Sequence, residues 1–140
     1  MTSNDLISDM LTRIRNANLV SSEKVLVPYT KVNSEIARIL KDEGFIESFE
    51  QTFNTKSSNS NSFPFICIVL KFKKGLRQKP YISFIKRISK PGLRSYVNAN
   101  NIPKVWGGIG VAVLSTSSGL MTNKEAKLRG LGGEVLFYIW

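Results

Sequence analysis

Apolar positions in the first half of the chain repeat with two periods, which predicts a mixture of helices and strands. Between residues 6 and 17, and again between residues 32 and 40, apolar side chains recur every three or four positions, as in an amphipathic helix. Alternation at residues 25–27, the fragment at 45–52 and the mostly apolar run at 65–72 predict three strands. The predicted order is helix, strand, helix, strand, strand, which forms a small α/β layer with both helices on one sheet face.

The second half of the chain is mostly β-forming and is divided by turn signals. Lys90-Pro91-Gly92 and Gly107-Gly108 each interrupt runs of β-branched and aromatic residues. One short helix is predicted, because Thr122 and Glu125 have the spacing of a capping box and Gly130 stands where a C-terminal glycine is expected. This half therefore predicts a β-rich domain with one short helix.

A basic segment at residues 73–80, broken by glycine and proline, separates the two patterns and is predicted to be a linker. We therefore expect an α+β fold of two small domains: an N-terminal αβαββ domain over residues 1–72 and a C-terminal β-rich domain over residues 81–140. Residues 54–62, all of which are Asn, Ser, Thr or Lys, are predicted to be a mobile loop.

Residue types on which many catalytic sites depend are missing or scarce among the 140 residues. The chain has no His, which excludes a His base and imidazole metal ligands, and its single Cys67 excludes internal disulfides and cysteine-rich zinc sites. The glycine-rich runs 107–110 and 130–133 match neither phosphate-binding loop motif. Beyond residue 62 only Glu125 and Glu134 are acidic, too few for the carboxylate cluster of a metal-dependent nuclease. We predict no enzymatic activity, no metal, no cofactor and no small-molecule substrate.

The charge is strongly asymmetric. The formal net charge is +10, and residues 63–140 hold 13 Lys and Arg against 2 Asp and Glu, whereas residues 1–62 hold 7 against 8. Such a one-sided excess repels itself, which favours a polyanionic partner. The longest apolar run, residues 65–70, is far shorter than the ~20 residues of a membrane span. A nucleic acid is therefore the expected partner, and a membrane is not.

The segment Ser115-Thr116-Ser117-Ser118-Gly119 follows a β run and precedes the capped helix. Small hydroxyls and open backbone can approach RNA closely and bond phosphates, 2′-hydroxyls or base edges, although most such loops only form turns. Tyr96 could stack on a base or belong to the core. On the first predicted helix, Asp9 stands four residues before Arg13, which predicts a surface ion pair, whereas Arg15 has no acid at that spacing.

Several long motifs, in order along the chain, resemble the bacterial-type family of small-subunit ribosomal protein eight. They cover residues 9–17, 86–96, 102–104, 115–122 and 132–135. The resemblance implies two small domains that grip a helical RNA element by its minor groove and an irregular core. In the family, the residues that match Ser115, Thr116, Ser117, Tyr96, Gly133 and Glu134 lie at the RNA surface.

With the basic residues added, the predicted RNA-binding set is Ser115, Thr116, Ser117, Gly119, Tyr96, Gly133, Glu134, Lys86, Arg87, Lys90, Arg94, Arg13 and Arg15. The chain has Ser118 where the family often has Lys or Arg, and residues 54–62 resemble an insertion in a hairpin. The ending Tyr138-Ile139-Trp140 resembles plastid and cyanobacterial members, which favours the chloroplast stroma over the bacterial cytoplasm.

The function expected from the residues and the resemblance together is structural. We predict a constituent of the small ribosomal subunit that binds the central domain of the ribosomal RNA, contacts neighbouring small-subunit proteins and supports assembly. The alternative is a free RNA-binding repressor that acts on messenger RNA, which the same surface would also allow.

Overall fold

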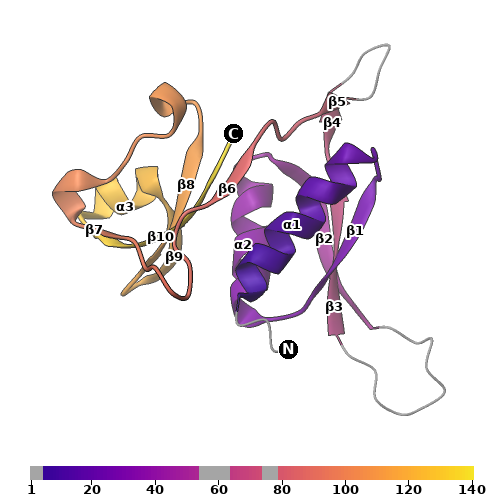
Figure 1. The fold of residues 1–140 in the computed structure, drawn as a ribbon, viewed down its shortest axis with the longest axis horizontal. Helices are drawn as coiled ribbons and strands as arrows, with labels where there is room; N and C mark the ends of the chain where they lie inside the picture. The colour runs from indigo at the N-terminus through magenta and orange to yellow at the C-terminus, as the bar shows by residue number, and fades with distance from the viewer. Residues whose placement is uncertain (1–4, 54–63, 74–78) are drawn as a thin grey trace. The chain divides into compact units, whose positions relative to one another are not determined.

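The N-terminal unit of the fold, residues 6–81, is a three-stranded antiparallel sheet with two helices against one face (Figure 1). The computed structural model describes residues 5–53, 64–73 and 79–140, so the predicted loop at 54–62 lies outside the described residues. The sheet order is β1-β3-β2. The elements are α1 (Leu6–Leu19), β1 (Lys24–Pro28), α2 (Lys31–Asp42), β2 (Ile46–Phe53) and β3 (Pro64–Leu70).

The predicted helix and strand order of this unit is confirmed, and so is the position of both helices on one sheet face. The Thr30 hydroxyl caps α2 by accepting a hydrogen bond from the Asn33 amide at 3.0 Å. The chain leaves α2 through Gly44, whose φ of 81° suits only glycine without strain. Side chains from both helices and from β3 form the core: Met10, Leu11, Ile14, Ile36, Leu40, Ile66 and Ile68, each at most 1% exposed.

The segment predicted as a linker has paired ends. Strands β4 (Phe72–Lys73) and β5 (Lys79–Pro80) form a short antiparallel ladder, while residues 74–78 lie outside the described residues. Next to this ladder, the Tyr81 amide donates to the Lys71 carbonyl at 3.1 Å, and the Lys71 amine lies 4.6 Å from the centre of the Tyr81 ring. These contacts place Tyr81 in the N-terminal unit.

The C-terminal unit, residues 82–140 together with Asp5, is built on a five-stranded antiparallel sheet (Figure 1). Strands follow the order β6-β10-β8-β9, and β7 also pairs with β10. Its elements are β6 (Ile85–Arg87), β7 (Tyr96–Val97), two short 3-10 helices (Ala99–Asn101 and Trp106–Gly108), β8 (Val111–Thr116), β9 (Gly119–Thr122), α3 (Asn123–Arg129) and β10 (Gly133–Ile139). The prediction of a β-rich region with one short α-helix is confirmed.

Local signals placed this helix and the turns correctly, with one exception. Thr122 caps α3 by accepting from the Glu125 amide at 3.2 Å, and Gly130 ends it with a left-handed φ of 67°. Lys90 and Leu93 exchange two backbone hydrogen bonds across the predicted Pro-Gly turn. The exception is the Glu125 side chain, which pairs with Arg129 at 2.9 Å, one helical turn away, so only the Thr122 half of the predicted capping box is observed.

Helix α3 covers one face of the C-terminal sheet over a small buried cluster: Val105, Ala112, Leu114, Met121, Ala126 and Val135. The buried Asn123 side chain fixes the start of the helix. Its amide nitrogen donates to the Pro103 carbonyl at 3.1 Å, and its oxygen accepts from the Ala112 amide at 3.2 Å. Across the described ranges, no helix has the length and hydropathy needed to cross a membrane.

Candidate nucleic-acid interface

Strand pairing brings three of the predicted site residues into one row at an end of the C-terminal sheet. Glu134 at the start of β10 lies opposite Tyr96 of β7 on one side and opposite Ser115 of β8 on the other. Side chains directly opposite each other in antiparallel strands point to the same face. Tyr96 is 70% exposed, so it is not a core residue, and Glu134 and Ser115 are half-buried.

Two glycines let β10 enter between its neighbours. A Cβ on Gly133 would lie 2.2 Å from the Ser115 carbonyl oxygen, and one on Gly132 would lie 2.4 Å from the Val97 carbonyl oxygen. No side chain fits at either distance, so packing alone explains both glycines. Gly133 therefore serves the interface by allowing the close approach of β8 that places Ser115 beside Glu134.

Glu134 is held by an arginine from the same predicted set. The Arg94 Nη1 atom lies 3.4 Å from both carboxylate oxygens, and the Glu134 side chain is only 14% exposed while Arg94 is 45% exposed. The carboxylate therefore orients a guanidinium whose other donors remain accessible. This pairing joins residues 40 positions apart, and nothing in the local sequence indicated it.

The predicted hydroxyl segment forms a tight hairpin between β8 and β9, with Ser117 and Ser118 as its two-residue loop. The Thr116 hydroxyl donates to the Gly119 carbonyl at 2.8 Å and accepts from the Ser118 amide at 3.1 Å. Thr116 is thus engaged within the turn, and Gly119 has a φ of 104° that favours glycine. Ser117 is exposed at the tip, and its side chain has no hydrogen-bond partner among the described residues.

Basic residues of the set differ in what their side chains contact. Lys86, Lys90 and Arg94 are exposed. Arg87 is not: its side chain is 9% exposed, it pairs with Asp5 at 3.2 Å and donates to the Leu136 carbonyl at 2.7 Å. The Arg87 guanidinium is thus engaged inside the C-terminal unit, and its participation in RNA binding stays a prediction.

Arg13 and Arg15 lie on α1 of the N-terminal unit and are exposed. The predicted ion pair is present, with Arg13 Nε 3.0 Å from Asp9, and Arg13 also donates to the Leu26 carbonyl at 3.2 Å. Arg13 thus fastens α1 to β1. Participation of either arginine in RNA binding stays a prediction.

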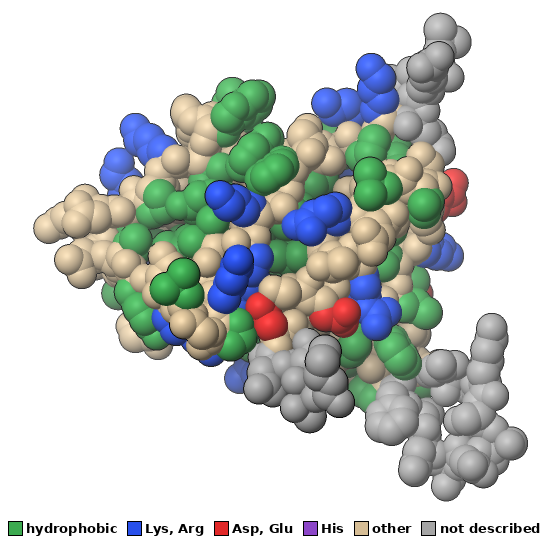
Figure 2. Space-filling view, in the orientation of Figure 1, with side chains coloured by type: hydrophobic (Ala, Val, Ile, Leu, Met, Phe, Trp, Pro, Cys, Tyr) green, Lys and Arg blue, Asp and Glu red, His purple; other side chains and the backbone are tan. Residues whose placement is uncertain are grey.

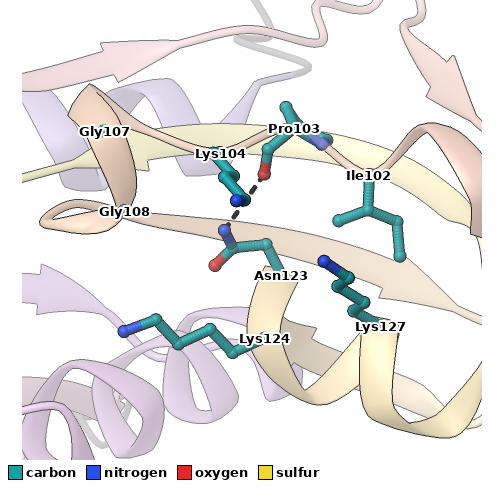
Figure 3. Close-up of a pocket in the computed structure, with 8 residues that line it drawn as sticks. All are labelled: Ile102, Pro103, Lys104, Gly107, Gly108, Asn123, Lys124 and Lys127. Carbon is teal, nitrogen blue, oxygen red and sulfur yellow. Dashed lines mark hydrogen bonds between the residues drawn. The ribbon is translucent and has the colours of Figure 1, made fainter.

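A lysine-rimmed pocket, which the sequence analysis missed, lies between α3 and the segment before β8 (Figure 3). Its volume is about 170 Å³, and its lining is Ile102, Pro103, Lys104, Gly107, Gly108, Asn123, Lys124 and Lys127. In Figure 3 the Lys127 side chain points toward Asn123, whereas Lys124 extends away from it. Because ammonium groups attract phosphate oxygens, a hollow lined by three lysines suits a phosphate group. The i, i+3 spacing of Lys124 and Lys127 was the only sequence signal available.

The charged surface of the C-terminal unit is dispersed. On the face seen in Figure 2, Lys and Arg side chains appear as separate spots among apolar and uncharged surface. Within the described part of the chain, no three His, Cys, Asp or Glu side chains group together as metal ligands would. The interface thus offers hydroxyls, an exposed tyrosine ring, an oriented guanidinium and scattered ammonium groups.

Comparison with known proteins gives the family. The family model for ribosomal protein S8 matches residues 5–140. The small ribosomal subunit protein uS8 of Trichodesmium erythraeum is 51% identical over 140 residues, 100% of both chains. The small ribosomal subunit protein uS8c of Chlorokybus atmophyticus is 52% identical, covering 98% of each chain, and that of Thalassiosira pseudonana is 52% identical over 97% of this chain and 98% of its own. The chain therefore belongs to the ribosomal protein S8 family.

Proposed function

We propose that this protein binds the central domain of small-subunit ribosomal RNA through the end of the C-terminal sheet where β7, β10 and β8 meet. As a member of the ribosomal protein S8 family, the chain is a structural constituent of the small ribosomal subunit and not an enzyme. The single observation that carries the choice of surface is the row formed by Tyr96, Glu134 and Ser115, with the Ser117 tip beside it.

Two kinds of contact contribute to binding in different ways. Exposed lysines such as Lys86 and Lys90 supply salt-dependent attraction to phosphates, which is insensitive to sequence. The hydroxyl tip, the Tyr96 ring and the Arg94–Glu134 pair occupy fixed positions on paired strands, so they fit only an RNA surface of matching shape. Affinity then comes mainly from the first group and specificity from the second.

This division predicts a clear outcome in a salt series. The full chain is titrated with a central-domain fragment of its small-subunit ribosomal RNA and with a scrambled fragment of equal length. Because only the true fragment gains shape-specific contacts, it should stay bound at salt concentrations that release the scrambled one. Release of both fragments at the same salt would contradict the proposed surface.

The compartment and the neighbours are further parts of the proposal. We place the protein in a plastid ribosome in the chloroplast stroma, beside other small-subunit proteins. Support comes from full-length identity of about half to both plastid uS8c chains and cyanobacterial uS8 chains. Immunodetection in ribosomes from purified chloroplasts would test the location, and detection only in another compartment would contradict it.

A further inference from the structure

Three aromatic rings stack at the end of the C-terminal sheet opposite the hydroxyl hairpin. Phe84 and Trp140 have ring centres 4.5 Å apart with planes 24° from parallel, and Trp106 and Trp140 have ring centres 6.1 Å apart with planes 15° from parallel. The backbones of Phe84 and Trp140 are held side by side, because they exchange two hydrogen bonds of 2.9 and 3.0 Å. Trp106 is therefore an outer ring of this stack, and it is 63% exposed.

The backbone at Trp106 is strained. Its φ of 48° lies in the left-handed region, which bulky residues adopt rarely and at a cost in free energy. The turn that imposes this φ is firmly built: the Gly108 and Gly110 amides both donate to the Val105 carbonyl at 3.0 Å. A Cβ on Gly110 would lie 2.6 Å from the Val105 side chain, so this turn also closes tightly at its base.

Stability of the fold does not explain a tryptophan at this position. Most of the indole surface stays in contact with solvent, so its burial contributes little, while Asn or Gly would fit the left-handed backbone better. Strain of this kind is typically retained where it serves a site. Figure 2 shows apolar side chains gathered where Figure 1 draws the turn before β8, in agreement with the exposure of Trp106 and Ile109.

The surroundings of Trp106 favour a nucleobase over an apolar protein surface as the group that stacks on its exposed ring. Gly107 and Gly108, directly after Trp106, leave open space where a Cβ would stand, and both line the lysine-rimmed pocket. That pocket supplies Lys104, Lys124 and Lys127, and an exposed ring beside ammonium groups is the combination that binds unpaired nucleotides.

We propose that Trp106 extends its stack with an unpaired RNA base, whose phosphates are attracted by the lysine-rimmed pocket. This inference rests on the proposed binding of ribosomal RNA. It adds a second contact area at the other end of β8, which is six residues long, so that the two areas lie roughly 20 Å apart along the strand. The Ser117 tip and Trp106 would then contact different parts of one RNA.

The test compares Trp106→Asn, Trp106→Phe and Ile109→Asn in the full chain. Ile109 is a matched control because it lies in the same turn, is 72% exposed and takes no part in the ring stack. With the central-domain fragment as probe, we expect Trp106→Asn to weaken binding about 5- to 100-fold, since one stacked base contributes that much. Trp106→Phe keeps a ring and should weaken binding less, and Ile109→Asn should leave it unchanged.

Folding is controlled by thermal melting, in which Trp106→Asn should melt no lower than the parent, because Asn adopts the left-handed backbone more readily. A second readout is the fluorescence of a Trp140→Phe chain, where Trp106 is the remaining tryptophan and RNA should quench it. Parent affinity in Trp106→Asn would overturn the inference. If the Trp106→Asn variant binds RNA normally but fails to enter reconstituted subunits, the inference is also overturned. The Trp106 ring would then contact a neighbouring protein instead of RNA.

The same titrations separate this inference from the proposed function. If the parent does not distinguish the central-domain fragment from the scrambled one, the proposed function fails. Because stacking tolerates any base, a weaker affinity of Trp106→Asn for both fragments would even then uphold the inference. Absence of any RNA binding by the parent would overturn both.

Discussion

Arg94 and Glu134 form an ion pair that links the turn before β7 to the first residues of β10, with the Arg94 Nη1 atom 3.4 Å from each carboxylate oxygen. The pair stands next to Tyr96, which lies opposite Glu134 in the sheet. In a strongly basic half of the chain, this acid anchors a guanidinium. We propose that it also accepts a hydrogen bond at the edge of the proposed RNA surface.

Replacing Glu134 with Gln should reduce specificity without reducing general affinity. The amide keeps the shape but loses the charge, and a hydrogen bond to a neutral acceptor is weaker than one to a carboxylate by about 1 kcal/mol. Affinity for the central-domain fragment should fall about fivefold, while affinity for scrambled RNA stays equal or rises because one negative charge is gone. Filter binding at one fixed salt concentration measures the ratio, and an unchanged ratio would argue against the acceptor role.

Ser117→Ala tests the hydroxyl tip. If the hydroxyl bonds RNA directly, specific binding should weaken by about 1 to 3 kcal/mol, with no change in melting temperature because Ser117 makes no bond within the described residues. Isothermal titration with the central-domain fragment measures the loss. Ser118→Ala, the other residue of the same two-residue loop, is the matched comparison. Equal affinity of the Ser117 variant and the parent would remove this residue from the interface.

Lys86 and Arg87 are neighbours on β6, yet their substitutions should act on different quantities. Lys86→Ala should weaken target and scrambled RNA alike and lower the slope of log affinity against log salt by about 1. Arg87→Ala should instead reduce the free energy of unfolding by about 3 to 5 kcal/mol, because it removes a nearly buried guanidinium that pairs with Asp5 and donates to the Leu136 carbonyl.

Urea denaturation and a salt series of RNA titrations separate these two effects. In the absence of urea, and at a temperature where the Arg87→Ala variant is still folded, its slope of log affinity against log salt should equal that of the parent. A lowered slope would show that Arg87 reaches the RNA after all, and a selective loss of target binding in the Lys86 variant would show that Lys86 reads shape instead of phosphate charge.

How far the sequence predicted this fold depends on the range over which each signal acts. Helices α1 and α2 and the Thr122 cap were predicted because periodicity and capping involve residues within one or two helical turns. The Arg94–Glu134 and Arg87–Asp5 pairs were missed because they join segments that lie 40 and 82 positions apart in the sequence. The burial of the Arg87 side chain could not be predicted from the sequence for the same reason.

The candidate site was predicted only in part. Family motifs named Ser117, Tyr96 and Glu134, and the register of β10 then placed Tyr96 and Glu134 in one row. Neither the ring stack at Trp106 nor the lysine-rimmed pocket could be read from the sequence, because the first depends on an unusual backbone angle and the second on α3 crossing near the segment before β8. The periodicity of apolar residues predicts neither the ring stack nor the pocket.

The close entry of β10 between its neighbours predicts that Gly133→Ala destabilises the C-terminal unit. An added Cβ would lie 2.2 Å from the Ser115 carbonyl oxygen, so β8 and β10 would have to separate, and forced shifts of this kind typically cost about 1 to 3 kcal/mol. Gly92→Ala is the matched control, since its Cβ would meet nothing within 4 Å and it lies in the exposed turn between Lys90 and Leu93. Denaturant unfolding should show the loss in the first variant alone. Because Ser115 is displaced with β8, the Gly133→Ala variant should also discriminate less between central-domain and scrambled RNA. Equal free energies of unfolding for the two variants would contradict this prediction, because they would show that β8 and β10 can accommodate the added Cβ.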